Sequence, residues 1–147
     1  MMISIRPFAG FVKQVRSKLR QGELSREPVK LLRLEWKPER VECDWLMRPP
    51  DPWDTYIPPH KARENVTSQA LKDALTLRNM IFKVFPAVDM AELRMFQFDA
   101  DQQLELMMTG TIARNDQFYE RVPSMAMRAK LCGFHFTLAH GAFERRS

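Results

Sequence analysis

Two carboxylates two positions apart on a predicted strand are the residues of this chain that come closest to a reaction centre. Glu42 and Asp44 follow the alternation of a strand, so both side chains project from one face. His135, on a later predicted strand, could join them in a ligand site or a general acid/base centre, if burial raised the pKa of one carboxyl. The alternative is a solvated face on which residues such as Arg33 and Arg94 form cross-strand ion pairs of about 0.2–1 kcal/mol each.

Other patterns that carry chemistry are missing from the sequence. The three histidines, His60, His135 and His140, form no HxH or HExxH motif, and the acidic turn 99–101 lacks the glycine and the later glutamate of a calcium loop. There is no GxSxG, no SxxK and no phosphate-binding glycine loop. We therefore expect no metal, no cofactor and no catalytic residue, and the sequence favours a protein that is not an enzyme.

Positive charge is concentrated near the N-terminus. Residues 1–40 contain ten Lys and Arg against four Asp and Glu, whereas residues 41–147 contain thirteen against fourteen. The spacing predicts a helix over residues 8–21, with one apolar stripe (Phe8, Phe11, Val12, Val15 and Leu19) and a basic stripe of Lys13, Arg16 and Arg20. An acidic protein surface or an anionic membrane would suit the basic stripe.

The apolar stripe of this helix has two interpretations. Phe8, Phe11 and Val15 could enter a membrane interface, and the acid-free start is also typical of an organelle-targeting presequence. Alternatively, the stripe packs onto the sheet of its own domain and leaves the bases in water. Nucleic acid is a further candidate for a chain with a pI near 9.5, but no RNP-like, zinc-finger or GxxG motif accompanies the helix.

Residues 49–59 form a Pro-rich aromatic segment with five prolines in eleven positions. That composition excludes helix and central strand and predicts an extended loop. Trp53 and Tyr56 could make it a recognition segment, because a preformed extended backbone lowers the entropy cost of binding. The alternative is that these aromatic side chains fold back and cover the edge of the core.

The remaining patterns predict one α+β domain spanning residues 1–147. Period-two alternation predicts hairpins over residues 32–47 and 92–112 and a last strand over 134–138. Apolar residues at spacings of three and four predict a long helix over 63–85, and another helix, which Asn115 or Asp116 could cap, ends at Gly133. The fold class is a five-stranded, largely antiparallel sheet with helices packed on one face, in the order α-β-β-α-β-β-α-β.

This order of elements over residues 69–139 resembles that of a BON domain. The likeness rests on the run Met108-Thr109-Gly110-Thr111-Ile112, which closes a hairpin, and on Gly133-Phe134, which opens the last strand. The resemblance implies a small module that contacts membrane surfaces or proteins. It implies no functional residue.

Cysteine usage and elimination complete the expectations. Two cysteines without a CxxC pair, and no apolar run that could span a bilayer or form a signal peptide, indicate a reducing, cytoplasmic compartment. The leading hypothesis is a non-catalytic binding or assembly module that engages a protein partner, or a second copy of itself, through Lys13, Arg16, Arg20, Trp53 and Tyr56. The alternatives are a membrane-surface or nucleic-acid-associated accessory protein, and a small enzyme or ligand binder with a site at Glu42, Asp44 and His135.

Overall fold

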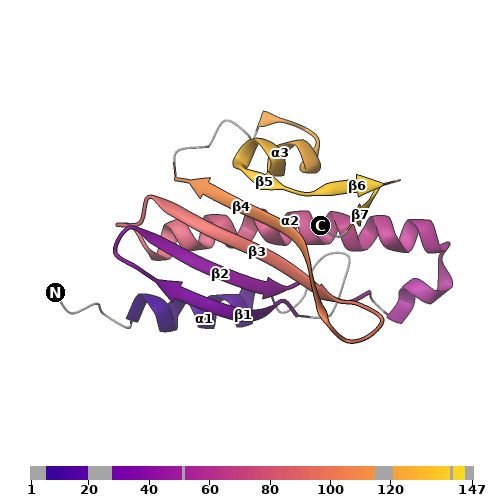
Figure 1. Cartoon of the computed structure of the whole chain (residues 1–147), viewed down its shortest axis with the longest axis horizontal. Helices are drawn as coiled ribbons and strands as arrows, with labels where there is room; N and C mark the ends of the chain where they lie inside the picture. Colours follow the sequence, from indigo (N-terminus) through magenta and orange to yellow (C-terminus); the bar gives the residue numbers. More distant parts are fainter. Residues whose placement is uncertain (1–5, 20–27, 51, 115–120, 140, 145–147) are drawn as a thin grey trace.

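The computed structural model describes residues 6–19, 28–50, 52–114, 121–139 and 141–144. Within these ranges the chain forms a five-stranded sheet in the order β1-β2-β3-β4-β5, with its helices on one face (Figure 1). The predicted fold class and order of elements are confirmed.

The elements run in chain order as follows: α1 (Arg6–Lys18), β1 (Lys30–Trp36), β2 (Arg40–Leu46), the short 3-10 helix η1 (Pro52–Tyr56), α2 (Pro59–Val84), β3 (Met90–Phe98), β4 (Leu104–Ala113), α3 (Met125–Cys132), β5 (Phe134–His135), β6 (Thr137–Ala139) and β7 (Ala142–Glu144). Neighbouring strands of the sheet are antiparallel except β2 and β3, which are parallel. This exception follows from α2, because a helix that crosses over the sheet returns the chain in its original direction.

Alternation along the strands separates a core face from an open face. Trp45, Leu93, Met108 and Phe134 are buried in one cluster with residues of α2 such as Ile81. The intervening side chains of the same strands project from the other face, which no helix covers among the described residues. The sheet is therefore one layer of a two-layer domain.

Two β-bulges change the pattern that simple alternation predicts. The register between β1 and β2 shifts at Leu32, so Leu31 takes the core position opposite Trp45 and Leu32 is exposed. The register between β3 and β4 shifts at Met107. The extra residue of a bulge breaks the alternation, and Met107 is consequently buried although it falls on the polar phase of its strand.

Two sequence predictions are wrong in their details. The Pro-rich segment was expected to contain no helix, but η1 occupies Pro52–Tyr56 and α2 begins at Pro59. Proline is tolerated in a first helical turn, where its missing N–H has no partner to lose. The predicted last strand is also interrupted: β5 ends at His135, and β6 pairs with β7 in a separate two-stranded sheet.

Two glycines allow the last strand to lie close to β4. A Cβ on Gly110 would lie 2.9 Å from the Phe134 ring, and Gly133 has a φ of +118° at the C-cap of α3. The predicted helix end at Gly133 is confirmed. At the other end of α3, Ser124 is the N-cap residue and its Oγ accepts a hydrogen bond from Met127 N; Asn115 and Asp116 lie outside the described residues.

Candidate functional site

A cleft of about 510 Å³ lies at the end of the sheet where β2 and β3 finish and β4 begins. The first half of α2 and strand β7 close its other sides, toward the right of the molecule in Figure 1. Its walls are mainly apolar and come from distant segments of the chain: Pro28, Lys30, Leu46, Met47, Arg48, Pro49, Pro50, Ala62, Arg63, Val66, Thr67, Gln97, Phe98, Met107, Ala142 and Phe143. A mainly apolar cleft of this size with a few polar groups is typical of a small-molecule site.

A buried ion pair supports one wall of the cleft. Arg48 and Asp73 are each less than 5% exposed, and the guanidinium donates from Nε to Asp73 Oδ2 at 2.7 Å and from Nη2 to Oδ1 at 3.1 Å. Gln69 Nε2 donates to the same Oδ1 at 3.0 Å. A two-pronged pair of this kind fixes the planar guanidinium in one orientation, so the polar part of the wall is preorganised.

Strand β7 is attached to α2 at the opposite wall. Phe143 N donates to Thr67 Oγ1 at 3.3 Å, and the Phe143 ring packs edge-on against Phe136 with centroids 5.6 Å apart. Thr67 is buried, so this contact holds the short hairpin against the helix. The cleft thus depends on tertiary contacts of the last residues described.

No sequence pattern predicts this cleft, although one signal points to its polar wall. Gln69 and Asp73 lie four residues apart and fall on the apolar face of the predicted long helix, where polar side chains need partners. The partner, Arg48, lies 25 positions from Asp73 in the chain. No local pattern could have linked them.

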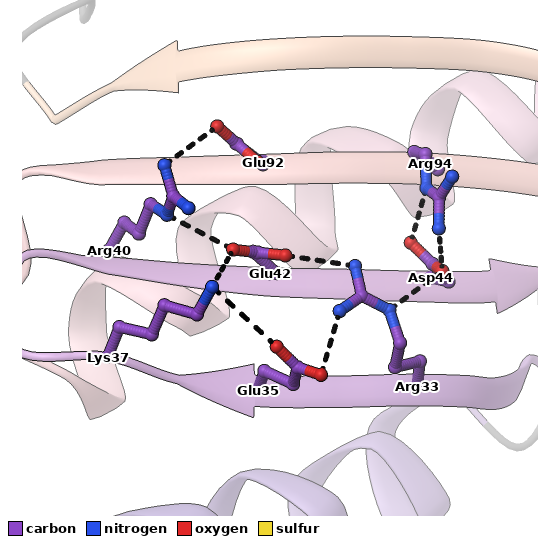
Figure 2. Close-up of polar contacts among 8 residues, drawn as sticks. All are labelled: Arg33, Glu35, Lys37, Arg40, Glu42, Asp44, Glu92 and Arg94. Carbon is purple, nitrogen blue, oxygen red and sulfur yellow. Dashed lines mark hydrogen bonds and ion pairs between the residues drawn. The ribbon is translucent and has the colours of Figure 1, made fainter.

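The open face of the sheet contains the carboxylates that the sequence singled out. Figure 2 shows Arg33 reaching from β1 to Glu42 and Asp44 on β2, with N–O distances of 3.1 Å to both. Arg94 of β3 contacts Asp44 from the other side at 2.6 and 2.9 Å. Lys37 Nζ lies 2.8 Å from Glu42 Oε2.

We call the eight side chains in Figure 2 the ion-pair network: Arg33, Glu35, Lys37, Arg40, Glu42, Asp44, Glu92 and Arg94. It joins four cations to four carboxylates across three strands. Beside it lies a depression of about 400 Å³, lined by Arg33, Glu42, Glu92, Arg94 and residues 109–111 of β4, among others. The four cations and four carboxylates balance, so the network has no net formal charge.

The network keeps Glu42 and Asp44 ionised. Hydrogen bonds from Lys37 and then Arg33 lower the pKa of Glu42 to about 2. Burial alone would raise the pKa of Asp44, but hydrogen bonds from Arg94 and Arg33 outweigh it and leave this pKa below its usual value. A general acid at neutral pH needs the opposite shift, so neither carboxyl is tuned to donate a proton.

His135 is not brought together with Glu42 and Asp44. It lies on β5 opposite Thr109, so β3 and β4 separate it from β2. Three strand spacings amount to roughly 14 Å, which is too far for a shared proton. Within the described ranges no three His, Cys, Asp or Glu side chains are grouped as metal ligands would be.

The predicted partner-binding residues fall in two separate places. Lys13 and Arg16 are exposed on α1, whose Phe11 ring lies 5.9 Å from that of Phe85, just beyond the C-terminal end of α2. The 3-10 helix η1 precedes the N-terminal end of α2, which is 26 residues long, or about 39 Å. Arg20 lies outside the described residues.

The apolar stripe of α1 and the aromatic residues of η1 differ in burial. Phe11, Val15 and Leu19 are buried in the core of the same chain, so in this structure they do not face a membrane or a partner. Trp53 and Tyr56 are 61% and 81% exposed and do not cover the core edge.

Comparison with known proteins returns no match: neither a protein-family model, nor a curated protein, nor a solved structure is similar to this chain. The likeness to a BON domain therefore stays one of element order. No helix in the described part of the chain is long and apolar enough to cross a bilayer.

Proposed function

We propose that this protein is a non-catalytic binding module whose apolar cleft holds a small organic molecule. The observation that carries the proposal is the cleft of about 510 Å³ with a preorganised polar wall. Burying a drug-sized ligand in such a cleft removes apolar surface from water, which supplies the main driving force for binding.

The chemistry around the cleft supports binding rather than catalysis. Arg48 is one of three basic residues in the lining, and it is held in the wall by its contact with the Asp73 carboxylate. Among the described lining residues there is no Ser, Cys, His, Asp or Glu that could act as nucleophile or base. The hydroxyl of Thr67 accepts a hydrogen bond from Phe143 N and has no such base beside it in this lining. Cys43 and Cys132 are buried as thiols, which fits a reducing compartment such as the cytoplasm.

A fluorescence titration with N-phenylnaphthylamine, a neutral probe that brightens in apolar surroundings, tests this proposal. Wild type should bind the probe, and Ala62→Phe, which adds a ring to the helical wall of the cleft, should weaken binding about tenfold or more. Ser68→Phe is the matched control, because Ser68 is exposed on the same helix and does not line the cleft.

Two results would overturn the proposal. One is the absence of any saturable binding by wild type, and the other is equal binding by Ala62→Phe and Ser68→Phe. Urea unfolding of each variant shows whether it is folded, and Ala142→Phe fills the cleft from β7 if Ala62→Phe does not fold.

A second candidate function is a protein contact through η1, made either with another protein or with a second copy of this chain. The exposed pair Trp53 and Tyr56, whose rings lie 6.1 Å apart, favours it, because large aromatic side chains dominate protein interfaces. Sedimentation of wild type and of Trp53→Ala/Tyr56→Ala tests the self-association form. A concentration-dependent dimer that the double variant loses supports it, and a monomer at all concentrations rejects it.

If the basic residues Lys13 and Arg16 of α1 also belong to this interface, they form a contact that is separate from that of η1. Lys13→Glu/Arg16→Glu should then weaken the dimer independently of the aromatic substitutions, because the two segments lie toward opposite ends of α2. Unchanged association and unchanged salt dependence would remove α1 from the interface.

A further inference from the structure

We propose that the ligand of the cleft is a singly charged anionic amphiphile, such as a medium-chain carboxylate, with its charged group at Lys30 and Arg63. This inference rests on the proposed function and adds the chemical class and the orientation of the ligand.

The charge of the lining residues is the first argument. Three of them, Lys30, Arg48 and Arg63, are basic, and no described lining residue is acidic. This differs from the ion-pair network, where four cations meet four carboxylates. A cleft with basic residues of its own and low-dielectric walls attracts an anion.

The position of the basic residues gives the orientation. Arg48 is buried and already bound to Asp73, so its charge is compensated within the wall. Lys30, at the start of β1, and Arg63, in the first turns of α2, are both exposed and therefore belong to the rim. At this rim an ammonium and a guanidinium are both available for charge-assisted contacts with a carboxylate, which stays close to water.

The interior suits a flexible hydrocarbon chain. Met47 and Met107 are buried side chains of the lining, and the bulge in β4 turns Met107 toward the core. Methionine adapts its shape to irregular apolar ligands because it is unbranched and polarisable. Phe98, half exposed in the lining, continues the apolar wall outward from the interior.

Displacement of bound N-phenylnaphthylamine by decanoate and by decanol tests the inference, since the two competitors share a chain length and differ in charge. Lys30→Gln/Arg63→Gln should raise the decanoate concentration needed for displacement about tenfold and leave that of decanol unchanged. The reason is that the variant removes the two exposed ion pairs that the decanoate carboxylate would form with the rim. Lys61→Gln/Lys83→Gln is the control, because both lysines are exposed on α2 and neither lines the cleft.

The outcomes separate this inference from the proposed function. If the double variant weakens decanoate and decanol equally, or weakens neither, the anionic class is rejected while the cleft remains a binding site. If the probe binds but Ala62→Phe has no effect, the cleft is not the site, and both proposals fall.

Discussion

The cleft and the open face of the sheet use charged side chains in different ways. On the open face, cations and carboxylates alternate across neighbouring strands and satisfy one another within the network (Figure 2). At the cleft, one ion pair is buried in the wall, while Lys30 and Arg63 lie on the rim with no acidic residue among the described lining. A surface with balanced charge offers no net charge to an ion, whereas a basic rim on an apolar cleft favours anions over cations.

The largest expected effect comes from breaking the buried pair. Asp73→Ala leaves the Arg48 guanidinium in a site that is less than 5% exposed, so the free energy of unfolding should fall by about 3–5 kcal/mol. Urea unfolding measures this loss. Arg48→Met/Asp73→Leu, which removes both charges, should recover most of the stability; a double variant as unstable as Asp73→Ala would contradict this account of the wall.

The contribution of the open face to the free energy of unfolding should decrease in acid. The folded-state pKa values of Glu42 and Asp44 are lowered, so the stability that they provide is complete above their unfolded pKa values. It should be lost as pH falls from about 4.5 toward about 2. Unfolding measured across this range should be less pH-dependent in Glu42→Gln/Asp44→Asn than in wild type. Parallel curves for the two proteins would contradict the prediction.

Removing a single charge from the network at neutral pH should lower the free energy of unfolding by less than Asp73→Ala does. Asp44→Asn weakens the contacts from Arg33 and Arg94, whose side chains are 34% and 46% exposed and can turn to water. We expect a loss of about 1–2 kcal/mol in the free energy of unfolding. Asp101→Asn, in the exposed β3–β4 turn, is the control and should be close to neutral; a loss as large as that of Asp73→Ala would erase the distinction between the two regions.

Much of this fold was predictable because local patterns and tertiary packing agree. Val41, Cys43 and Trp45 alternate with Glu42 and Asp44, and the structure buries the first set in the core as period two requires. The ion-pair network follows from the same alternation, which placed Arg33 and Arg94 beside these carboxylates.

The features that the sequence did not predict have a different physical origin. Bulges at Leu32 and Met107 depend on how two strands fit each other, which neither strand shows alone. The cleft could not be predicted from the sequence because its walls come from segments as far apart as Pro28 and Phe143, and only the folded chain brings them together.

The smallest expected effect on stability belongs to the rim of the cleft. Lys30→Gln/Arg63→Gln should change the free energy of unfolding by less than about 0.5 kcal/mol, because both side chains are exposed. Thermal or urea unfolding provides the check. A loss above about 1 kcal/mol would mean that these residues stabilise the fold, and would contradict a role in ligand binding alone.

The most direct measurement is an NMR titration of isotope-labelled methionine methyl groups with decanoate. Met47 and Met107 line the cleft, whereas Met90 and Met127 are exposed on β3 and α3 outside it. The account predicts saturable shifts of the Met47 and Met107 methyl signals with Met90 and Met127 unmoved. Equal shifts of all four signals, or movement of Met90 and Met127 alone, would contradict it.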